Sequence, residues 1–281
     1  MKKIEVRCPS CAGRGFIEVS EEKVGKVERG VFAVNVSEGI ICEHSFVAYI
    51  DKNFMVRDTF ITDFQLEVPD IIPKKSIEPK ASAQLDSINV SLIKLNLSAS
   101  LIAYIIRAIL HKRKIVLIFD QLFMFDDVRR FFDYITRNSF ETELVVISED
   151  QYNSESYNDY IVFNRKDVIK DDDGIIDVKK LGVERALVQK FFEEYEPIPS
   201  LIYLQNGLQK AYELSETIAD IVKGLKKKEQ VYSKKIIKDL SKIHNVKIQL
   251  TYLNFLFKIV ENYFKIEVPK SSKVSNFLGT L

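Results

Sequence analysis

The chain has 281 residues, which suits two or three domains, and its 46% hydrophobic and 11% aromatic content excludes an intrinsically disordered protein. A net charge of +1 neither favours nor disfavours a polyanionic partner. No apolar run reaches the ~18 residues of a membrane span and no signal peptide is recognised, so we expect a cytoplasmic protein.

The three cysteines lie near the start of the chain, together with one of the three histidines. Cys8 and Cys11 form a C-x-x-C motif, and Cys42 and His44 form a C-x-H motif further along. Thiolate and imidazole are the usual ligands of tetrahedral Zn²⁺, and four protein ligands close its coordination shell. The spacing therefore predicts a structural zinc site in a zinc-ribbon-like module. The alternative is three ordinary buried thiols and a surface histidine.

The first part of the chain, residues 1–68, is predicted to be rich in β-strands. Alternating β-branched and aromatic residues indicate strands over 3–7, 15–19, 31–36, 45–50 and 54–60. Asp51, Lys52 and Asn53 favour a hairpin turn, and Gly13 and Gly15 suit the tight backbone of a metal knuckle. The polar segment 20–29 is expected to form a loop or one helical turn, and residues 69–80, broken by three prolines, a linker.

The middle part, residues 81–195, alternates between strands and helices. We expect strands over 87–97, 114–119, 143–148 and 159–164, and helices over 98–111 and 125–138. Ser98 is the expected N-cap of the first helix. This alternation is typical of a parallel α/β sheet.

The last part, residues 196–281, is predicted to be helical. Two prolines in 196–200 should end one helix before another begins, and helices are expected over 200–224, 226–244 and 248–264. The expected fold class is α+β and multidomain, with a small zinc-bound β domain, a central parallel α/β domain and a C-terminal helical domain.

Residues 97–177 contain a run of short motifs in a characteristic order. Leu97-Ser98-Ala99-Ser100 precedes a helix that ends in Arg107-Ala108-Ile109-Leu110, and the apolar strand 115–119 is followed by Asp120. Asp126 opens the next helix, two further strands follow over 144–148 and 159–163, and Gly174 lies in a later turn. This run resembles the C-terminal half of an ABC-type ATPase nucleotide-binding domain, from its signature motif through the Walker B strand and the D-loop.

The chain also departs from that family. Gln121 stands at the position of the family's catalytic glutamate and Glu149 at that of its switch histidine. The signature glycines are missing, and no G-x-x-x-x-G-K-[ST] occurs in the sequence, so no Walker A loop is present to hold phosphates. The resemblance therefore implies a degenerate module that neither binds ATP in the family's manner nor hydrolyses it.

Two further groups of charged residues are candidates for binding. Asp120, Asp126, Asp127, Glu149 and Asp150 should gather beyond the carboxyl ends of the parallel strands, where they would bind Mg²⁺. The alternative is helix-capping and solvated loop acids. Lys226, Lys227, Lys228, Lys234 and Lys235 would bind an anion such as nucleic acid, or form a solvated helix face. His111 and His244 are expected to be capping or surface residues.

These observations favour a non-catalytic adaptor or regulatory protein that acts by binding another protein. The first alternative is a nucleic-acid-associated factor that uses the zinc module and the lysine-rich helix. The second is a Mg²⁺-dependent phosphoryl-transfer or phosphodiester enzyme centred on Asp120.

Overall fold

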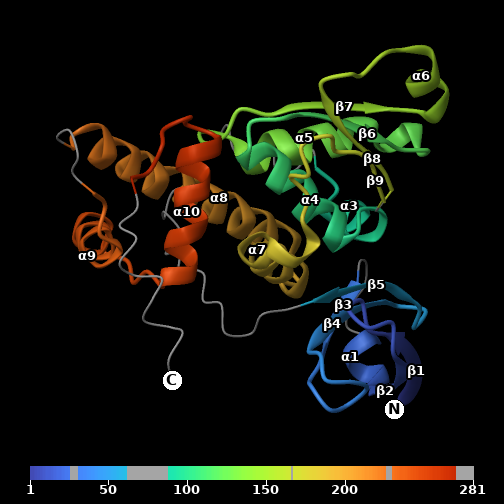
Figure 1. The fold of residues 1–281 in the computed structure, drawn as a ribbon. Coiled ribbons are helices and arrows are strands. Elements are labelled where there is room, and N and C mark those ends of the chain that lie inside the picture. Colours follow the sequence, from blue (N-terminus) through green and yellow to red (C-terminus); the bar gives the residue numbers. More distant parts are fainter. Residues whose placement is uncertain (26–30, 62–87, 166, 226–229, 270–281) are drawn as a thin grey trace.

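The computed structural model describes residues 1–25, 31–61, 88–165, 167–225 and 230–269, an α+β arrangement with three sheets in these ranges (Figure 1). The chain begins with an antiparallel hairpin of β1 (Lys2–Arg7) and β2 (Arg14–Val19), followed by the short helix α1 (Glu21–Gly25). The hairpin buries alternate residues on one face, Ile4 and Val6 from β1 and Ile17 and Val19 from β2. The strand pattern of the sequence is therefore confirmed here.

The second sheet has the strand order β3-β4-β5 and is antiparallel throughout, with β3 (Val31–Val36), β4 (Phe46–Asp51) and β5 (Val56–Ile61). All six residues of the central strand β4 are buried. Phe46, Ala48 and Ile50 pack in one cluster with the buried face of the hairpin. Val47 and Tyr49 pack on the opposite side, in the large cluster that contains the helices. This sheet is consequently covered on both faces.

The third sheet has the order β7-β6-β8-β9. Its strands are β6 (Lys114–Ile118), β7 (Glu143–Ile147), β8 (Tyr160–Asn164) and β9 (Asp167–Lys170). Strand β6 is parallel to both β7 and β8, which confirms the parallel pairing expected from the sequence, whereas β9 is an added antiparallel edge strand.

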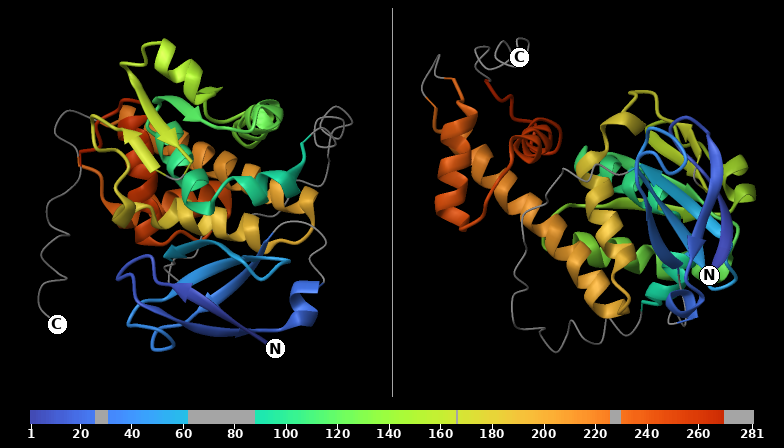
Figure 2. Two further views of the ribbon diagram at one scale, coloured as in Figure 1. Left: turned by 90° about the vertical axis from the view of Figure 1, so that its right-hand side faces the viewer. Right: turned by 90° about the horizontal axis from the view of Figure 1, so that it is seen from below.

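Different elements cover the two faces of this sheet. Helices α4 (Ala99–Leu110) and α5 (Phe125–Thr136) share the large core cluster with one face of the sheet. The short helix α6 (Glu149–Ser154) and Tyr152 and Tyr157 cover the other face. In the left view of Figure 2 the hairpin, the β3–β5 sheet, the helices and the third sheet form successive layers. Helix α4 contacts both β5 and β6, so it lies between the two sheets.

Residues 87–97, expected as a strand, contain instead the helix α3 (Val90–Asn96), and the prediction was wrong. The alternation of large apolar residues suggested a period of two. The apolar residues Val90, Ile93 and Leu97 are buried, and their spacing places them on one face of a helix. The Asn89 side chain accepts a hydrogen bond from Leu92 N (3.1 Å) and caps the helix.

The remaining helices surround the long helix α8. Helix α8 spans Pro197–Lys223, and the helices that pack against it are α7 (Gly182–Glu193), α9 (Ser233–His244) and α10 (Leu250–Asn262). Helix α8 starts at Pro197, before the expected start at 200, because the missing N–H of proline costs nothing in the first helical turn. Helix α7 is the helix that was expected to end before the two prolines in 196–200, although no bounds were predicted for it. One continuous cluster of buried hydrophobic residues runs from Val47 of β4 to Val260 of α10.

The domain boundaries remain predictions, and the expected linker 69–80 lies outside the described residues.

A buried ion pair joins α4 to α7. Arg107 Nε lies 2.6 Å from Glu184 Oε1, and Arg107 Nη2 donates a hydrogen bond to the Lys180 carbonyl oxygen. Burial raises the pKa of Glu184, and the charge of Arg107 opposes that effect. The arginine that carries part of the family resemblance thus has a structural partner in the helix layer.

No single helix in the described ranges is long and apolar enough to span a membrane. Helices α3 and α4 meet the length and composition criterion only when taken together, and a bend of 101° separates them.

Asp51 organises the hairpin turn between β4 and β5. Its Oδ1 atom accepts hydrogen bonds from the backbone N–H groups of Asn53 (2.8 Å) and Met55 (2.9 Å), and its Oδ2 atom pairs with Arg57. Burial opposes ionisation of this carboxyl group. The hydrogen bonds from Met55, Arg57 and Asn53 outweigh burial and lower the pKa of Asp51.

We expect Asp51→Asn to lower the free energy of unfolding at pH 7 by about 1–3 kcal/mol, because the neutral amide loses charge-assisted bonds inside the protein. Since the folded pKa is lower than the unfolded one, this contribution is complete above about pH 5 and disappears as the pH falls through the folded pKa. Urea unfolding from pH 7 to pH 3.5 should show the wild type and the variant converging. Lys52→Gln, at an exposed position in the same turn, is the control. Parallel loss of stability in the wild type and Asp51→Asn would contradict this role.

Candidate metal centre

The turn between β1 and β2 holds the first two cysteines. Cys8 N donates to the Gly13 carbonyl oxygen (2.8 Å) and Ala12 N to the Cys8 carbonyl oxygen (3.0 Å), which folds the C-x-x-C segment into a tight loop. The left-handed residue is Ala12, with φ of 59°, and not one of the glycines. Gly13 is favoured by close approach, because a Cβ atom there would lie 3.3 Å from the Sγ atom of Cys11.

The connection between β3 and β4 supplies the other two residues. Gly39 has φ of 84°, in the left-handed region, and its N–H donates to the carbonyl oxygen of Cys42 (2.8 Å). Ile41, just before Cys42, packs so closely on the first loop that a Cβ atom on Gly15 would lie 3.0 Å from its Cγ1 atom. The two loops are therefore in direct contact before any metal is considered.

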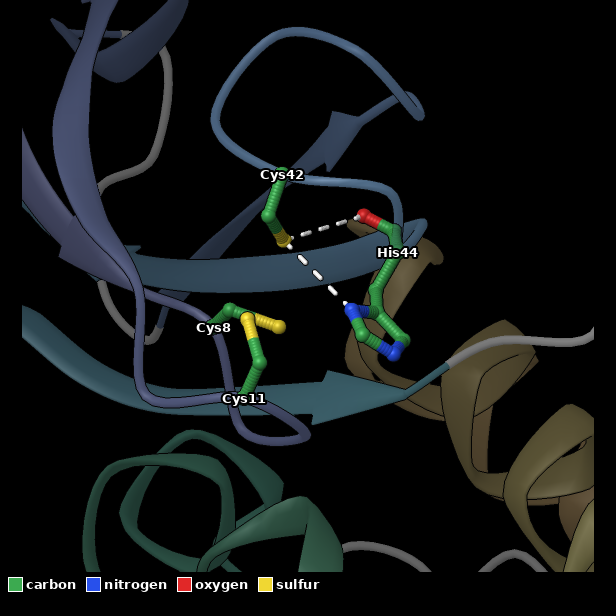
Figure 3. A group of neighbouring side chains, drawn as sticks. All are labelled: Cys8, Cys11, Cys42 and His44. Carbon is green, nitrogen blue, oxygen red and sulfur yellow. Dashed lines mark hydrogen bonds between the residues drawn. The ribbon is translucent and has the colours of Figure 1, made fainter.

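Cys8, Cys11, Cys42 and His44 bring their ligand atoms within 4.8 Å of one another. Figure 3 shows the three sulfur atoms and the imidazole of His44 facing one another, with the two knuckles on opposite sides. The distance from Cys42 Sγ to His44 Nδ1 is 3.7 Å. Tetrahedral zinc with ordinary bond lengths gives an S···N edge of about 3.6 Å. The donor set and its spacing thus fit a metal ion, and they are consistent with zinc.

The electrostatics of the cluster also favour a cation. Burial opposes ionisation of Cys8, but backbone N–H groups of Cys11 and Ser10 outweigh it and lower the pKa of Cys8. The backbone of His44 lowers the pKa of Cys42, whereas burial and the sulfur atoms of Cys11 and Cys8 outweigh that effect and raise it to about 11. Ionisation of one of these closely spaced thiols thus hinders ionisation of its neighbours. A divalent cation removes this repulsion by binding all of them as thiolates.

The five acids predicted to bind Mg²⁺ lie on β6, α5 and α6 or beside them, and several have partners of their own. Asp120 Oδ2 accepts a hydrogen bond from Arg165 Nη2 (2.7 Å), and Asp126 lies 3.6 Å from Arg129. Glu149 and Asp150 occupy the first turn of α6, and Asp127 that of α5, where acidic residues stabilise a helix. The four-residue cysteine and histidine cluster is the one group of metal-ligand type found in the described part of the chain. A magnesium site at these acids stays a prediction.

A residue that the sequence did not single out, Asp58 of β5, lies at the N-terminus of α4. Its Oδ2 atom accepts a hydrogen bond from Ser100 N (3.2 Å), and the expected cap Ser98 accepts one from Leu101 N (3.1 Å). A carboxylate from the β3–β5 sheet thus takes up the Ser100 N–H group at this helix end. No local pattern in the sequence could have revealed this contact, because the two residues are far apart in the chain.

The lysine-rich segment is only partly described. Lys226, Lys227 and Lys228 lie outside the described residues, whereas Lys234 and Lys235 are exposed on the first turn of α9. Anion binding by these residues is not tested by the structure.

No protein-family model and no curated protein matches this chain. The resemblance to an ABC-type ATPase domain is therefore not confirmed.

We expect the purified protein to contain about one divalent metal ion per chain, held by the four-residue cluster. Cys42→Ser should remove most of it, because three donors leave the shell open. Chelation should lower the melting temperature of the wild type more than that of Cys42→Ser. Elemental mass spectrometry and thermal unfolding measure both effects.

Glu43→Gln is the matched control, because Glu43 lies between Cys42 and His44 and is exposed. It should retain the metal. Equal metal content in Cys42→Ser and Glu43→Gln would rule out the cluster as the binding site.

Proposed function

We propose that this chain is a non-catalytic adaptor or regulatory protein, in which a structural zinc ion shapes a surface that binds another protein. The observation that carries the proposal is the four-residue cluster itself. Three sulfur donors and one nitrogen donor complete a tetrahedral shell, so no position remains for a substrate or a reactive water molecule. Such a site stabilises a fold and performs no chemistry.

The metal loops have neighbouring apolar side chains that face solvent. Phe16 follows Gly15 on β2 and Ile40 precedes Ile41 in the β3–β4 connection, and their exposed fractions are 66% and 56%. Because Gly15 and Ile41 are in contact, a metal ion that joins the two loops also fixes the backbone next to Phe16 and Ile40. Large exposed apolar residues on a rigid support are typical of protein-binding surfaces.

The α/β part supports the same conclusion. Asp58 occupies the helix end that would face a phosphate in the resembling family, and Asp120 pairs with Arg165. The sequence has no Walker A loop. A degenerate ATPase-like module with these features would serve as a scaffold for the metal-bearing part.

We expect the double variant Phe16→Ser, Ile40→Ser to bind a partner of the wild type with at least about tenfold lower affinity, because exposed apolar anchors dominate interface energies. The partner is identified by crosslinking in the native cell, and its affinity is measured with both proteins purified. Metal content should be unchanged. Leu122→Ser, Phe123→Ser is the matched control, since this exposed apolar pair lies elsewhere, next to Asp120.

Two results would contradict the adaptor proposal. One is binding that the control variant abolishes and the metal-loop variant leaves intact. The other is ATP hydrolysis by the purified protein that Asp120→Asn abolishes, because it would show that the α/β part is an active enzyme.

A second candidate function, nucleic-acid binding, is favoured by the surface of α9. Lys234, Lys235 and Lys238 are exposed there, and Tyr232, just before the helix, is 55% exposed. Cationic side chains beside an aromatic ring suit a phosphate backbone with a stacked base.

If this function is correct, affinity for a single-stranded oligonucleotide should fall steeply with salt, with a slope of about −0.7 per phosphate contact on a double-logarithmic plot. Changing Lys234, Lys235 and Lys238 together to Gln should flatten that slope. Fluorescence anisotropy measures both effects. Binding that is independent of salt, or unchanged in the triple variant, would exclude α9 as a nucleic-acid site.

A further inference from the structure

A polar cavity of about 400 Å³ lies away from the metal cluster, where the C-terminal ends of α4 and α10 meet the segment between β9 and α7. We call it the α4–α10 cavity. Its basic lining residues come from three separate segments. These residues are Arg107, His111, Arg113, Lys180 and Lys265. This volume lies within the range of small-molecule sites, roughly 300–1,000 Å³.

One wall of the cavity is a buried charge. Arg107 is only 5% exposed, and its ion pair with Glu184 and its bond to the Lys180 carbonyl oxygen hold the guanidinium in place. A buried, oriented arginine at a cavity wall is pre-organised, because the cost of ordering it is met by folding and not by ligand binding.

The other cations are held by weaker contacts. Arg113 pairs with Asp173 (2.5 Å) and Lys180 with Asp177 (2.8 Å), and the side chains of both pairs are partly exposed. Exposed pairs of this kind contribute at most about 1 kcal/mol, so an oxyanion with two charges can compete with a single carboxylate for either cation.

His111 responds to the charge around the cavity. Burial, followed by the positive charges of Arg107, Lys258 and Lys265, lowers the pKa of His111 to about 4, and Asp171 opposes them only weakly. The charged groups near this ring come from α4, from the residue before β6, from the 171–180 segment, from α10 and from residue 265. They are Arg107, Arg113, Asp171, Asp173, Asp177, Lys180, Lys258 and Lys265. The ring is thus neutral at pH 7 although it can carry a proton when an anion is near.

Three carbonyl groups near the C-terminal end of α4 are already engaged. The carbonyl oxygens of Arg107, Ala108 and Ile109 accept hydrogen bonds from the backbone N–H groups of His111, Lys112 and Arg113. These bonds satisfy acceptors that would otherwise repel a negative ligand at this helix end.

We propose that the α4–α10 cavity binds a phosphate group, either free or as part of a small phosphorylated molecule. Arg113, Lys180 and Lys265 contact the phosphate oxygens and His111 adds a donor, whereas Arg107, whose charge is paired with Glu184, forms part of the cavity wall. This site goes beyond the adaptor function and does not depend on it, because it shares no residue with the metal cluster.

The test is an NMR titration of the metal-loaded full chain with inorganic phosphate at pH 7 and constant ionic strength, with ribose 5-phosphate as a second arm. We expect saturable amide shifts confined to residues 107–113, 173–180 and 262–265. Lys265→Gln should weaken binding about fivefold, the effect of one partly solvated charge. Lys242→Gln, at an exposed position of α9, should leave the affinity unchanged.

Tighter binding of ribose 5-phosphate would identify a phosphorylated molecule as the ligand, and equal binding would identify free phosphate.

A second readout is the titration of His111 between pH 7 and pH 3.5, with and without sulfate, whose charge is constant over that range. A bound dianion favours the imidazolium form and should raise the pKa of His111 from about 4. The proposal is overturned if neither phosphate compound gives saturable shifts in these segments, if Lys265→Gln and Lys242→Gln bind equally well, or if sulfate leaves the His111 titration unchanged.

Discussion

Strand β4 is buried along its whole length, and the rest of the molecule depends on this double burial. Alternate residues of one six-residue strand enter two different cores, Phe46, Ala48 and Ile50 toward the hairpin and Val47 and Tyr49 toward the helices. A sheet face that buries large apolar residues must be covered. Removing either the hairpin or the helix layer would therefore expose one apolar face of β4 to water. The metal-bearing part and the helical part are therefore joined by packing and not only by the chain.

The metal cluster lies at the turn of the β1–β2 hairpin. The hairpin shares a small core with one face of the β3–β5 sheet, and its turn carries two of the four donors, whereas the β3–β4 connection carries the other two. Small modules with little core gain stability from a metal ion that links loops which are distant in sequence. Contact between Gly15 and Ile41 already brings the loops together. A metal ion would then hold the sulfur atoms of both loops in one negatively charged cluster.

In the α/β part, several charged side chains are paired with other groups of the protein. Asp58 bonds to the N-terminus of α4, Arg107 is neutralised by Glu184, and Asp120 is paired with Arg165. Arg113 and Lys180 of the α4–α10 cavity differ, because their carboxylate partners are exposed and an anion can displace them. The proposed phosphate site uses these cations at the C-terminal end of α4.

Local features of the sequence determined the cysteine and histidine motifs, the five N-terminal strands and the long C-terminal helices. They also determined the parallel strands 114–118, 143–147 and 160–164. Each of these depends on residue type and on periodicity over a few residues. Only the tertiary structure decided that 90–96 is a helix. Its apolar residues fit both the two-residue period of a strand and the spacing of a helix, and the helix forms because Val90 and Ile93 are then buried in the core. It also decided that both faces of β4 are covered, that Asp58 meets Ser100 and that Arg107 meets Glu184. The last two contacts join residues more than 40 positions apart, and no short-range pattern shows which distant partner a buried or charged side chain will meet.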